Sequence, residues 1–458
     1  MADALREDLE KIIPDPDRII TGEISEEYTK YAHGSLKGSA DAVVFPISRE
    51  EVSGIMKYAW DRKIPVTPRG ANTNLTGSTV PLEGGIVLDL SHMNRILEID
   101  EDTLTATVEP GVLLGDFQET VESKGLFYPP DPGEKKASLG GNISTNAGGM
   151  RAVKYGVTRD FVRGLEVVFA DGSIAELGGK TVKDASGLSL KNLLIGSEGT
   201  LAVITKAILR LLPKPECSVS AIAAFDDIQA GIRNVIRILH ANTQPTALEF
   251  AERSVAAIGE NYTGTKFPFP DAGAYILMTF DGDPESVKRN LEKTKDVVFA
   301  NGAEGFQPLS AEKAAEVWTV RGAFCTAVEA VSEQVPVDIV VPIDRTDKFV
   351  KFADQLAEET GLLMATYGHA GDGNIHINIA RGNLDDETWK ETLSKVLWAV
   401  YNETADLSGL PSGEHGIGLT KQKFYRKHAD PNAVSVMRSV KDALDKKHIL
   451  NDHKSYLA

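Results

Sequence analysis

Short apolar runs alternate with helical stretches along the first part of the chain. Residues 51–62 repeat apolar positions at helical spacing, which predicts an amphipathic helix. Pro213 and Pro215 interrupt both helix and sheet, so we expect a domain boundary at residue 214. Four runs of apolar and β-branched residues are bounded by turn residues and predict strands, at residues 42–45, 86–90, 105–108 and 165–169.

The pattern changes after this boundary. Strand-like residues 218–225 and 275–280 are each followed by a helical stretch, at 229–240 and 284–299. This order predicts an α+β domain in which helices cover one face of an antiparallel sheet. A glycine-rich loop begins near residue 407 and leads into helices, so we predict three parts of the chain, at residues 1–214, 215–407 and 408–458.

Charge and hydropathy narrow the function classes. The chain has 49 Lys and Arg residues against 66 Asp and Glu residues, and its net charge of −17 argues against binding to nucleic acid. No apolar run reaches the ~18 residues that a membrane span needs. The first residues do not form a signal peptide, so we expect a cytoplasmic protein. Cys217 and Cys325 stand far apart, which excludes cysteine-ligated clusters and a disulfide framework, and we expect both to be small buried side chains.

Three segments of the first part are unusually rich in small residues, at 68–77, 138–149 and 196–204. The first can turn backbone N–H groups inward as a nest for a pyrophosphate, although a plain surface loop has the same composition. The second has almost no bulk, which suits a loop that passes close to a flat ligand. The third is a turn leading into an apolar strand. Two common nucleotide motifs are missing: no G-x-G-x-x-G is present, and Gly179-Lys180-Thr181 lacks the first glycine of a P-loop.

A hairpin with two histidines is the most informative stretch of the second part. Residues 362–369 and 374–380 read as strands joined by a Gly-Asp-Gly turn. A two- or four-residue turn places His369 and His376 on one face, with Cβ atoms ~5–8 Å apart. Two imidazoles at that distance can bind one metal ion.

The segment 412–418 supplies a further acid and a further histidine. Glu414 would complete a His-His-Glu metal site with open positions, and His415 would be a general base near neutral pH. Arg321 follows a helical stretch, where a helix-end salt bridge is the plain alternative. The other histidines have no comparable setting and are expected to be structural or solvated: His33, His92, His240, His428, His448 and His453.

These motifs resemble the flavin-binding domain of the vanillyl-alcohol-oxidase (p-cresol methylhydroxylase) type. From about residue 20 onward the chain is similar to the FAD-linked 2-hydroxy-acid dehydrogenases, which include D-lactate dehydrogenase, glycolate oxidase large subunits and D-2-hydroxyglutarate dehydrogenase. The resemblance implies an α+β fold: a vanillyl-alcohol-oxidase-type FAD-binding domain, a cap domain with an antiparallel sheet, and C-terminal residues 408–458 that return to the FAD domain.

The resemblance also implies how FAD is held. The first small-residue segment would bind the pyrophosphate, the second would pass the flavin ring and the strand near Ile204 would meet the adenine. The first segment has no histidine, so non-covalent FAD is implied. The implied FAD-binding residues are Pro68, Arg69, Gly70, Ala71, Asn72, Thr73, Asn74, Gly77, Pro130, Asp131, Ser138, Gly141, Asn142, Thr145, Asn146, Gly149, Glu198, Gly199, Ile204 and Asn451.

The resemblance implies a role for each residue of these motifs. His369, His376 and Glu414 would bind a divalent metal (Zn, Fe or Mn), His415 would be the base, and Arg321 would hold the substrate carboxylate. The hydroxyglutarate branch would have Thr and Lys where this chain has Cys325 and Pro336, which argues for a short monocarboxylic substrate. We therefore expect oxidation of D-lactate to pyruvate, with glycolate or D-2-hydroxyglutarate as alternatives.

The expected electron acceptor is a quinone, a diffusible acceptor or a protein, such as electron-transferring flavoprotein or an iron–sulfur subunit. Two hypotheses of other classes explain less of the sequence. A flavin-free metallohydrolase leaves the three small-residue segments unexplained. A non-catalytic FAD-bearing relay subunit leaves Arg321 and His415 unexplained.

Overall fold

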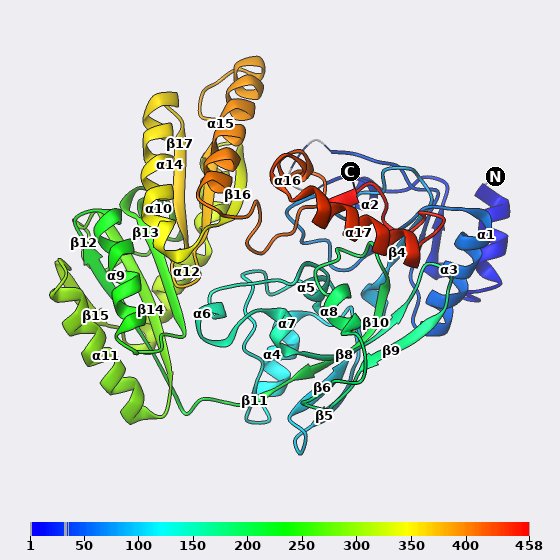
Figure 1. Cartoon of the computed structure of the whole chain (residues 1–458), viewed down its shortest axis with the longest axis horizontal. Coiled ribbons are helices and arrows are strands. Elements are labelled where there is room, and N and C mark those ends of the chain that lie inside the picture. The colour runs from blue at the N-terminus through cyan, green and yellow to red at the C-terminus, as the bar shows by residue number, and fades with distance from the viewer. Residues whose placement is uncertain (1, 32–33, 35, 458) are drawn as a thin grey trace. The chain divides into compact units, whose positions relative to one another are not determined.

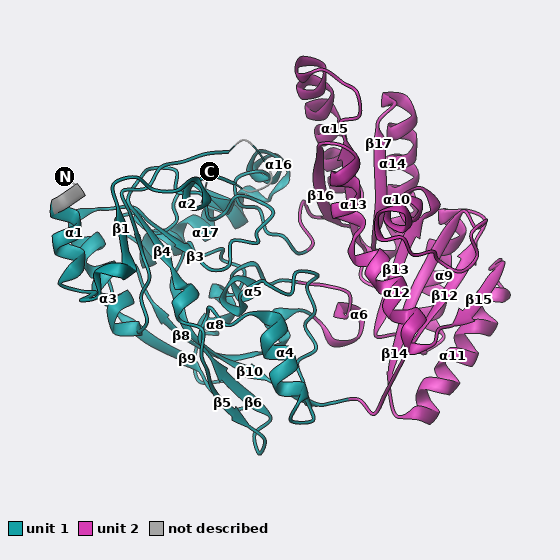
Figure 2. Cartoon of the chain, turned by 180° about the vertical axis from the view of Figure 1, so that it is seen from behind, with its two compact units in different colours: residues 1–147, 157–214, 414–458 teal, residues 148–156, 215–413 magenta. Residues whose placement is uncertain are grey.

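The computed structural model describes residues 2–31, 34 and 36–457 (Figure 1). His33 therefore lies outside the described residues. The chain forms two compact units (Figure 2), and the first unit contains residues 1–147, 157–214 and 414–458. The second unit contains residues 148–156 and 215–413. None of the described helices combines the length and the apolar character that crossing a membrane requires.

The chain enters the second unit at residue 215 and leaves it after Gly413, whereas the sequence placed the second change at residue 408. Residues beyond 407 stay with the second unit because Leu410 forms a β-bridge with Val340 and the Gly413 N–H donates to Asp338. The short segment 148–156, which begins at the end of the small-residue segment 138–149, also belongs to the second unit.

Two main sheets form the first unit. One has four strands in the order β1 (Ile19–Thr21), β2 (Ala42–Val44), β4 (Ile86–Asp89), β3 (Val66–Arg69), with β4 parallel to both β2 and β3. The other is antiparallel, in the order β5 (Ile96–Asp100), β6 (Thr105–Val108), β10 (Val203–Arg210), β8 (Val162–Val168), β9 (Ile174–Gly178). Strands β7 (Leu126–Phe127) and β11 (Leu212–Pro213) form a separate pair.

Helix α3 (Arg49–Arg62) forms where the sequence predicts it and packs its apolar face on the core of the four-stranded sheet. The Ser48 side chain caps its first turn, and Lys63 ends it in the left-handed conformation. The other α-helices of the unit are α1 (Ala2–Glu10), α2 (Glu26–Thr29), α4 (Leu114–Glu122), α5 (Leu139–Thr145), α7 (Thr158–Phe161), α8 (Leu190–Leu194), α16 (Gln422–His428) and α17 (Pro431–Leu444).

Helix α5 corrects one prediction. The small-residue segment 138–149, expected as a loop, begins as a helix because the Ser138 side chain accepts from the Gly141 N–H and caps it. Asn146, at a φ of 52°, then ends the helix in the left-handed region, which asparagine tolerates well.

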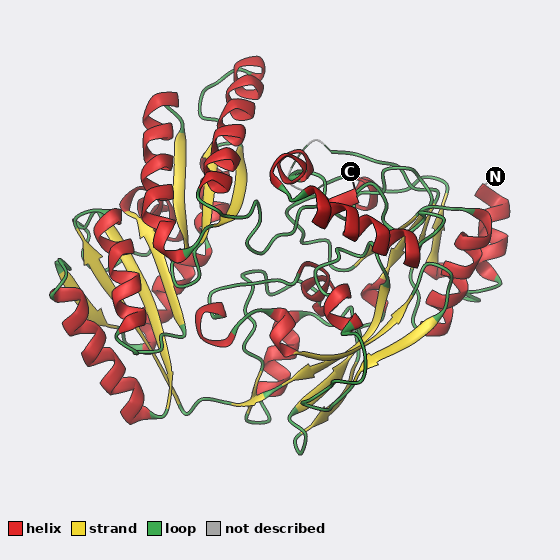
Figure 3. Cartoon of the chain, in the orientation of Figure 1, coloured by secondary structure: helices red, strands yellow, loops and turns green. Residues whose placement is uncertain are grey.

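One seven-stranded sheet forms the core of the second unit, and all its neighbouring strands are antiparallel, which confirms the expected sheet. Its order is β15 (Gly305–Pro308), β12 (Cys217–Phe225), β14 (Ala274–Gly282), β13 (Ala247–Glu252), β17 (Leu363–His369), β18 (Asn374–Ala380), β16 (Gln334–Val340). Strands and helices of this unit can be followed in Figure 3.

Helices pack on both faces of this sheet, so the prediction of one covered face is wrong. Tyr275 of β14 packs with Val320 and Phe324 on one side, whereas the neighbouring Ile276 lies against Gly231 on the other. The reason is that the central strands are buried on both faces: β14 carries an apolar run from Ala274 to Met278, and every residue of β18 is buried. The helices are α6 (Ala152–Tyr155), α9 (Ile228–His240), α10 (Arg253–Thr263), α11 (Pro284–Phe299), α12 (Ala311–Gly322), α13 (Phe324–Val331), α14 (Thr346–Thr360) and α15 (Asp386–Asp406).

Candidate active site

The hairpin of β17 and β18 carries the histidine pair. Its register places Tyr367 opposite His376 and His369 opposite Asn374, with residues 370–373 as the turn. The two histidines therefore lie diagonally on one face, which confirms the predicted geometry. Their Nε2 atoms are 3.3 Å apart, and the side chains are nearly buried, at 6% and 8% exposure.

Glu249 of β13 contacts His369 of this histidine pair. We did not identify Glu249 from the sequence. It lies opposite His369 in the sheet and is fully buried. Its Oε1 is 2.7 Å from His369 Nδ1, and its Oε2 accepts from Nε and Nη2 of Arg321 at 3.1 and 2.6 Å. Burial disfavours the charge, but His369 and Arg321 outweigh it and hold the pKa of Glu249 below its ordinary value. A carboxylate on Nδ1 selects the tautomer whose Nε2 lone pair is available to a metal.

Arg321 lies in the last turn of α12 and is almost entirely buried. Its guanidinium stands 4.7 Å from the ring centre of Tyr367 and is fixed by the two bonds to Glu249. Nη1 has no hydrogen bond within the described part of the chain. The side chain therefore forms the salt bridge that the plain alternative predicted and still presents one donor to an anion.

Asp338 of β16 fixes the segment that leads to Glu414, and it too was missed. It is fully buried, lies opposite His376, and accepts from Asn374 Nδ2 at 2.7 Å. It also accepts from Ser412 Oγ at 2.7 Å and from the Gly413 N–H at 3.1 Å. Because Glu414 is bonded directly to Gly413, these contacts set where its side chain begins. An acid within an apolar strand is the signal that could have revealed both Asp338 and Glu249.

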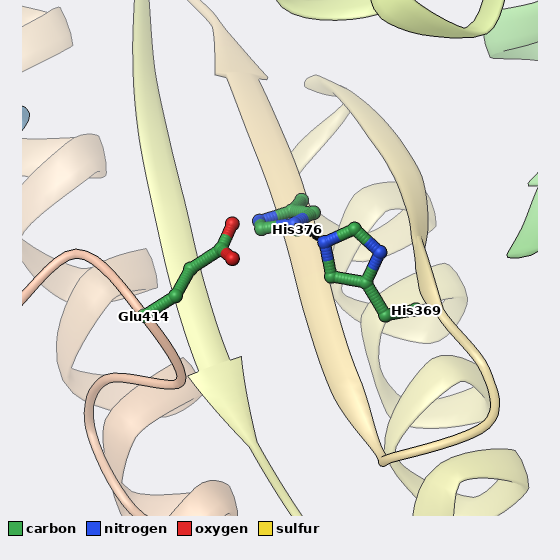
Figure 4. A group of neighbouring side chains, drawn as sticks. All are labelled: His369, His376 and Glu414. Carbon is green, nitrogen blue, oxygen red and sulfur yellow. Dashed lines mark hydrogen bonds between the residues drawn. The ribbon is translucent and has the colours of Figure 1, made fainter. Parts of the chain in front are cut away.

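His369, His376 and Glu414 come together as one group (Figure 4). One potential ligand atom from each lies within 4.8 Å of the others. Two imidazoles and one carboxylate suit a first-row divalent ion such as Zn, Fe or Mn, with positions left for further ligands. The nearly buried Nε2 atoms that face each other and the Glu249 contact on Nδ1 fit this use of the residues.

His415 lies beside Glu414, with its Nε2 3.5 Å from Glu414 Oε1. Its side chain is 21% exposed, so the imidazole is accessible. Its carbonyl accepts a long hydrogen bond of 3.4 Å from Thr76 Oγ1. An accessible imidazole in this position can act as a general base.

The segments predicted to hold FAD lie in the first unit apart from Gly148 and Gly149, and several of them are in contact there. Added Cβ atoms show how closely they pack: one on Gly70 would collide with Ser138 Oγ, and one on Gly199 would lie 2.8 Å from Pro68 Cγ. Asn451 follows α17, and its side-chain amide donates to the carbonyls of Ser78 and Glu198 at 3.2 and 2.8 Å. Glycine is thus required where these segments meet, which suits a backbone-lined cradle.

The remaining predicted residues fall on the same few elements. Pro68 and Arg69 end β3, and Gly70, Ala71, Asn72, Thr73, Asn74 and Gly77 form the loop that follows. Pro130 and Asp131 follow β7, Ser138 caps α5, Gly141, Asn142 and Thr145 lie within it, Asn146 and Gly149 follow it, Glu198 and Gly199 form a turn, and Ile204 lies in β10.

Two of these side chains are engaged elsewhere in the first unit. The Arg69 guanidinium donates to the Glu27 carbonyl and lies 3.4 Å from Asp89. The Glu198 carboxylate accepts from the backbone of residues 417 and 418.

Cys325 and Pro336 flank Asn378 on the face that carries His376. Pro336 lies opposite Asn378, whose Nδ2 donates to Gln334 Oε1 at 2.9 Å and contacts Cys325 Sγ at 3.2 Å. Burial raises the pKa of the Cys325 thiol. Cys325 and Cys217 are both unpaired but only half-buried, so the expectation of full burial is corrected.

Three of the histidines outside the site make ordinary contacts. His92 stacks on Phe45, His448 lies 3.0 Å from Asp442, and His453 lies 3.3 Å from Glu83.

Comparison with known proteins identifies two FAD-related domain families and two similar enzymes. The FAD binding domain family matches residues 40–178, and the C-terminal domain family of FAD linked oxidases matches residues 214–455. A D-lactate dehydrogenase of Anaerostipes hadrus is 38% identical over 453 residues, 96% of this chain and 94% of the relative. The glycolate oxidase subunit GlcD of Bacillus subtilis is 38% identical over 434 residues, 94% of this chain and 92% of the relative.

Among solved structures, p-cresol methylhydroxylase with bound substrate has a TM-score of 0.80 at 17% identity, covering 99% of this chain and 96% of that one. This likeness confirms the fold expected from the sequence. The FAD-binding domain contradicts the alternative of a flavin-free metallohydrolase.

Proposed function

The chain belongs to the family of FAD-linked hydroxy-acid dehydrogenases, and on that premise we propose that it oxidises a small D-2-hydroxy acid, D-lactate, to its 2-oxo acid. The observation that carries the proposal is the group of His369, His376 and Glu414, with Glu249 joining His369 to Arg321. The same chain thus has potential ligands for a cation, the fixed guanidinium of Arg321, the imidazole of His415 and an FAD-binding domain.

Each side chain has a definite task in this proposal. The Nη1 donor of Arg321 pairs with the substrate carboxylate, because a guanidinium matches a carboxylate in shape and charge. His369, His376 and Glu414 hold a divalent ion, and His415 accepts the proton of the C2 hydroxyl. When bound, FAD supplies the two-electron acceptor for the C2 hydrogen, and the metal lowers the pKa of the hydroxyl. In this reaction His415 takes the proton of the C2 hydroxyl, and bound FAD would be the acceptor of the hydride equivalent that leaves C2.

A short substrate is supported by the residues around Asn378. The Nδ2 group of Asn378 is already engaged by Gln334 and Cys325, and Pro336 offers no charge. These four residues include no lysine or arginine that could pair with a second carboxylate of the substrate. D-lactate is therefore favoured over D-2-hydroxyglutarate, and glycolate is the second candidate because a similar relative is a glycolate oxidase subunit.

We place the electron acceptor on another protein, such as electron-transferring flavoprotein or an iron–sulfur subunit. The two cysteines of the chain are too few to ligate an iron–sulfur cluster of its own. The Bacillus subtilis relative is named as a subunit, which supports a partner protein.

Anaerobic flavin reduction tests the reaction and the base together. The FAD-loaded enzyme is mixed with D-lactate, L-lactate, glycolate or D-2-hydroxyglutarate, and the flavin band is followed. We expect D-lactate to bleach the flavin fastest. In His415→Ala the FAD should stay bound while the rate of reduction falls roughly 100-fold or more, as expected for loss of a general base. A His415→Ala enzyme that D-lactate reduces as fast as the wild type would remove His415 from the reaction.

A further inference from the structure

Glu198 is a buried acid whose carboxylate is directed at the loop that carries His415. The residue is 6% exposed and sits in a tight turn with a φ of 52°, followed by Gly199 at 71°. Its Oε1 accepts from the Ile417 N–H at 3.0 Å, and its Oε2 accepts from the Gly418 N–H at 2.8 Å. Two successive backbone amides, two and three residues after His415, thus bind one carboxylate.

The loop lies directly against this carboxylate. A Cβ added to Gly416 would lie 2.9 Å from Glu198 Cδ, and Gly416 itself has a φ of 81°. A side chain at this position would therefore be both strained and obstructed. The close approach means that the path of residues 415–418 follows the position of Glu198.

Glu198 is in turn held by two other segments of the first unit. Its N–H donates to the Ser144 carbonyl of α5 at 2.8 Å, and its carbonyl accepts from Asn451 Nδ2 at 2.8 Å. Ser455 Oγ adds a third donor to the carboxylate, at 2.7 Å from Oε1. Segments predicted to hold FAD thus fix the acid, and the acid fixes the loop.

We propose that Glu198 is a positioning residue that orients His415 for proton transfer, and that its side chain is not an FAD ligand. The inference rests on the proposed function, in which His415 is the base. The hydrogen bond from Thr76 to the His415 carbonyl is long, at 3.4 Å, whereas Glu198 holds the N–H groups of Ile417 and Gly418 at 3.0 and 2.8 Å. Losing them would leave two inward-facing N–H groups without their acceptor and let the loop relax.

The test is Glu198→Gln in the FAD-loaded enzyme. The amide keeps the size of the side chain but turns an NH₂ group toward a backbone N–H donor, so one loop bond is lost. We expect normal FAD content, an apparent Kd for D-lactate within about threefold of wild type, and flavin reduction at saturating D-lactate slower by roughly 10- to 100-fold. Hydrogen exchange should speed up at the amides of Ile417 and Gly418.

Glu166→Gln is the matched control. Glu166, in β8, is also a buried acid of the first unit, but it accepts from Arg49 of α3 and from Thr205 and Lys206 of β10. We expect its reduction rate to stay within about twofold of wild type, so that loss of a buried charge alone is separated from loss of positioning.

Gly416→Ala provides a second variant if Glu198→Gln does not fold, because the added Cβ would push the same loop away from the Glu198 carboxylate. It should show the same slow reduction with normal FAD content. A Glu198→Gln enzyme that loses FAD, or one that D-lactate reduces at the wild-type rate, would overturn the role of Glu198. A wild-type enzyme that no hydroxy acid reduces would overturn the proposed function as well, so the two failures are distinguishable.

Discussion

At the scale of single residues, Glu249 shows how one buried acid can serve two functional side chains. One oxygen holds His369 Nδ1 and the other holds the Arg321 guanidinium. Each contact is a charge-assisted bond in a water-poor site, where such bonds are stronger than neutral ones. The carboxylate therefore sets the tautomer of the histidine and the direction of the arginine together.

Glu249→Gln should weaken metal binding roughly 10- to 100-fold, because a neutral amide supports the His369 tautomer less well. The measurement is a titration of metal-stripped, FAD-loaded enzyme with Zn²⁺ or Mn²⁺. Glu260→Gln is the control, since Glu260 is a buried acid of the second unit that pairs with Arg253 instead. Equal metal affinities for Glu249→Gln and wild type would show that this acid does not support the site.

The sequence predicted the residues of the candidate site better than their supports. Alternation along 374–380 and a short turn were enough to place His369 and His376 on one face. Glu249 and Asp338 were not predicted because each lies on another strand, opposite one of the two histidines. Glu249 is 120 residues from His369 in the sequence. Register between such distant strands depends on the tertiary fold, which local patterns do not contain.

At the scale of elements, two carboxyl groups of the second unit, those of Glu252 and Asp354, lie next to each other. Glu252 ends β13 at the N-cap position of α10, Asp354 lies on α14, and Gln229 of α9 donates to Asp354 at 3.4 Å. Burial and the neighbouring Asp354 raise the pKa of Glu252 to about 8. Packing of these helices on the sheet thus brings two carboxyl groups together in a site where both cannot easily be charged.

Glu252→Gln should stabilise the protein more as the pH rises. The pKa of Glu252 is higher in the folded than in the unfolded chain, so the folded state binds the proton more tightly. Wild-type stability therefore falls between about pH 4.5 and pH 8, and the glutamine variant escapes this loss. We expect the difference in unfolding free energy to grow by roughly 1–2 kcal/mol between pH 5 and pH 8.5 in urea titrations. A difference that does not change with pH would contradict the pKa shift.

The elements themselves were partly predictable. Helix α11 has the predicted bounds because its apolar period is regular and Asp283 caps it ahead of Pro284. The second covered face of the large sheet was not predicted, because alternation does not report it: β14 lacks alternation, and β18 alternates although all its residues are buried. Helix α5 was read as a loop because its glycines disfavour helix and only the Ser138 cap indicates one.

At the scale of the whole molecule, one change between the two units can be predicted from the sequence and another cannot. The change of unit at residue 214 is marked by two prolines. No sequence signal shows that residues 148–156 belong to the second unit, because their assignment depends on contacts with distant residues. Lys154 and Tyr155 donate to Asp281 at the end of β14, and Val153 lies against Gly371 in the hairpin turn.

We propose that oxidation of the hydroxy acid needs a cation as well as Arg321 and His415. The most direct measurement is anaerobic flavin reduction by D-lactate in enzyme that keeps its FAD but has been stripped of metal by a chelator, before and after Zn²⁺ or Mn²⁺ is restored. We predict that the stripped enzyme stays yellow and that the restored enzyme bleaches. Equally fast bleaching in the stripped enzyme, or none after the metal is restored, would contradict the account.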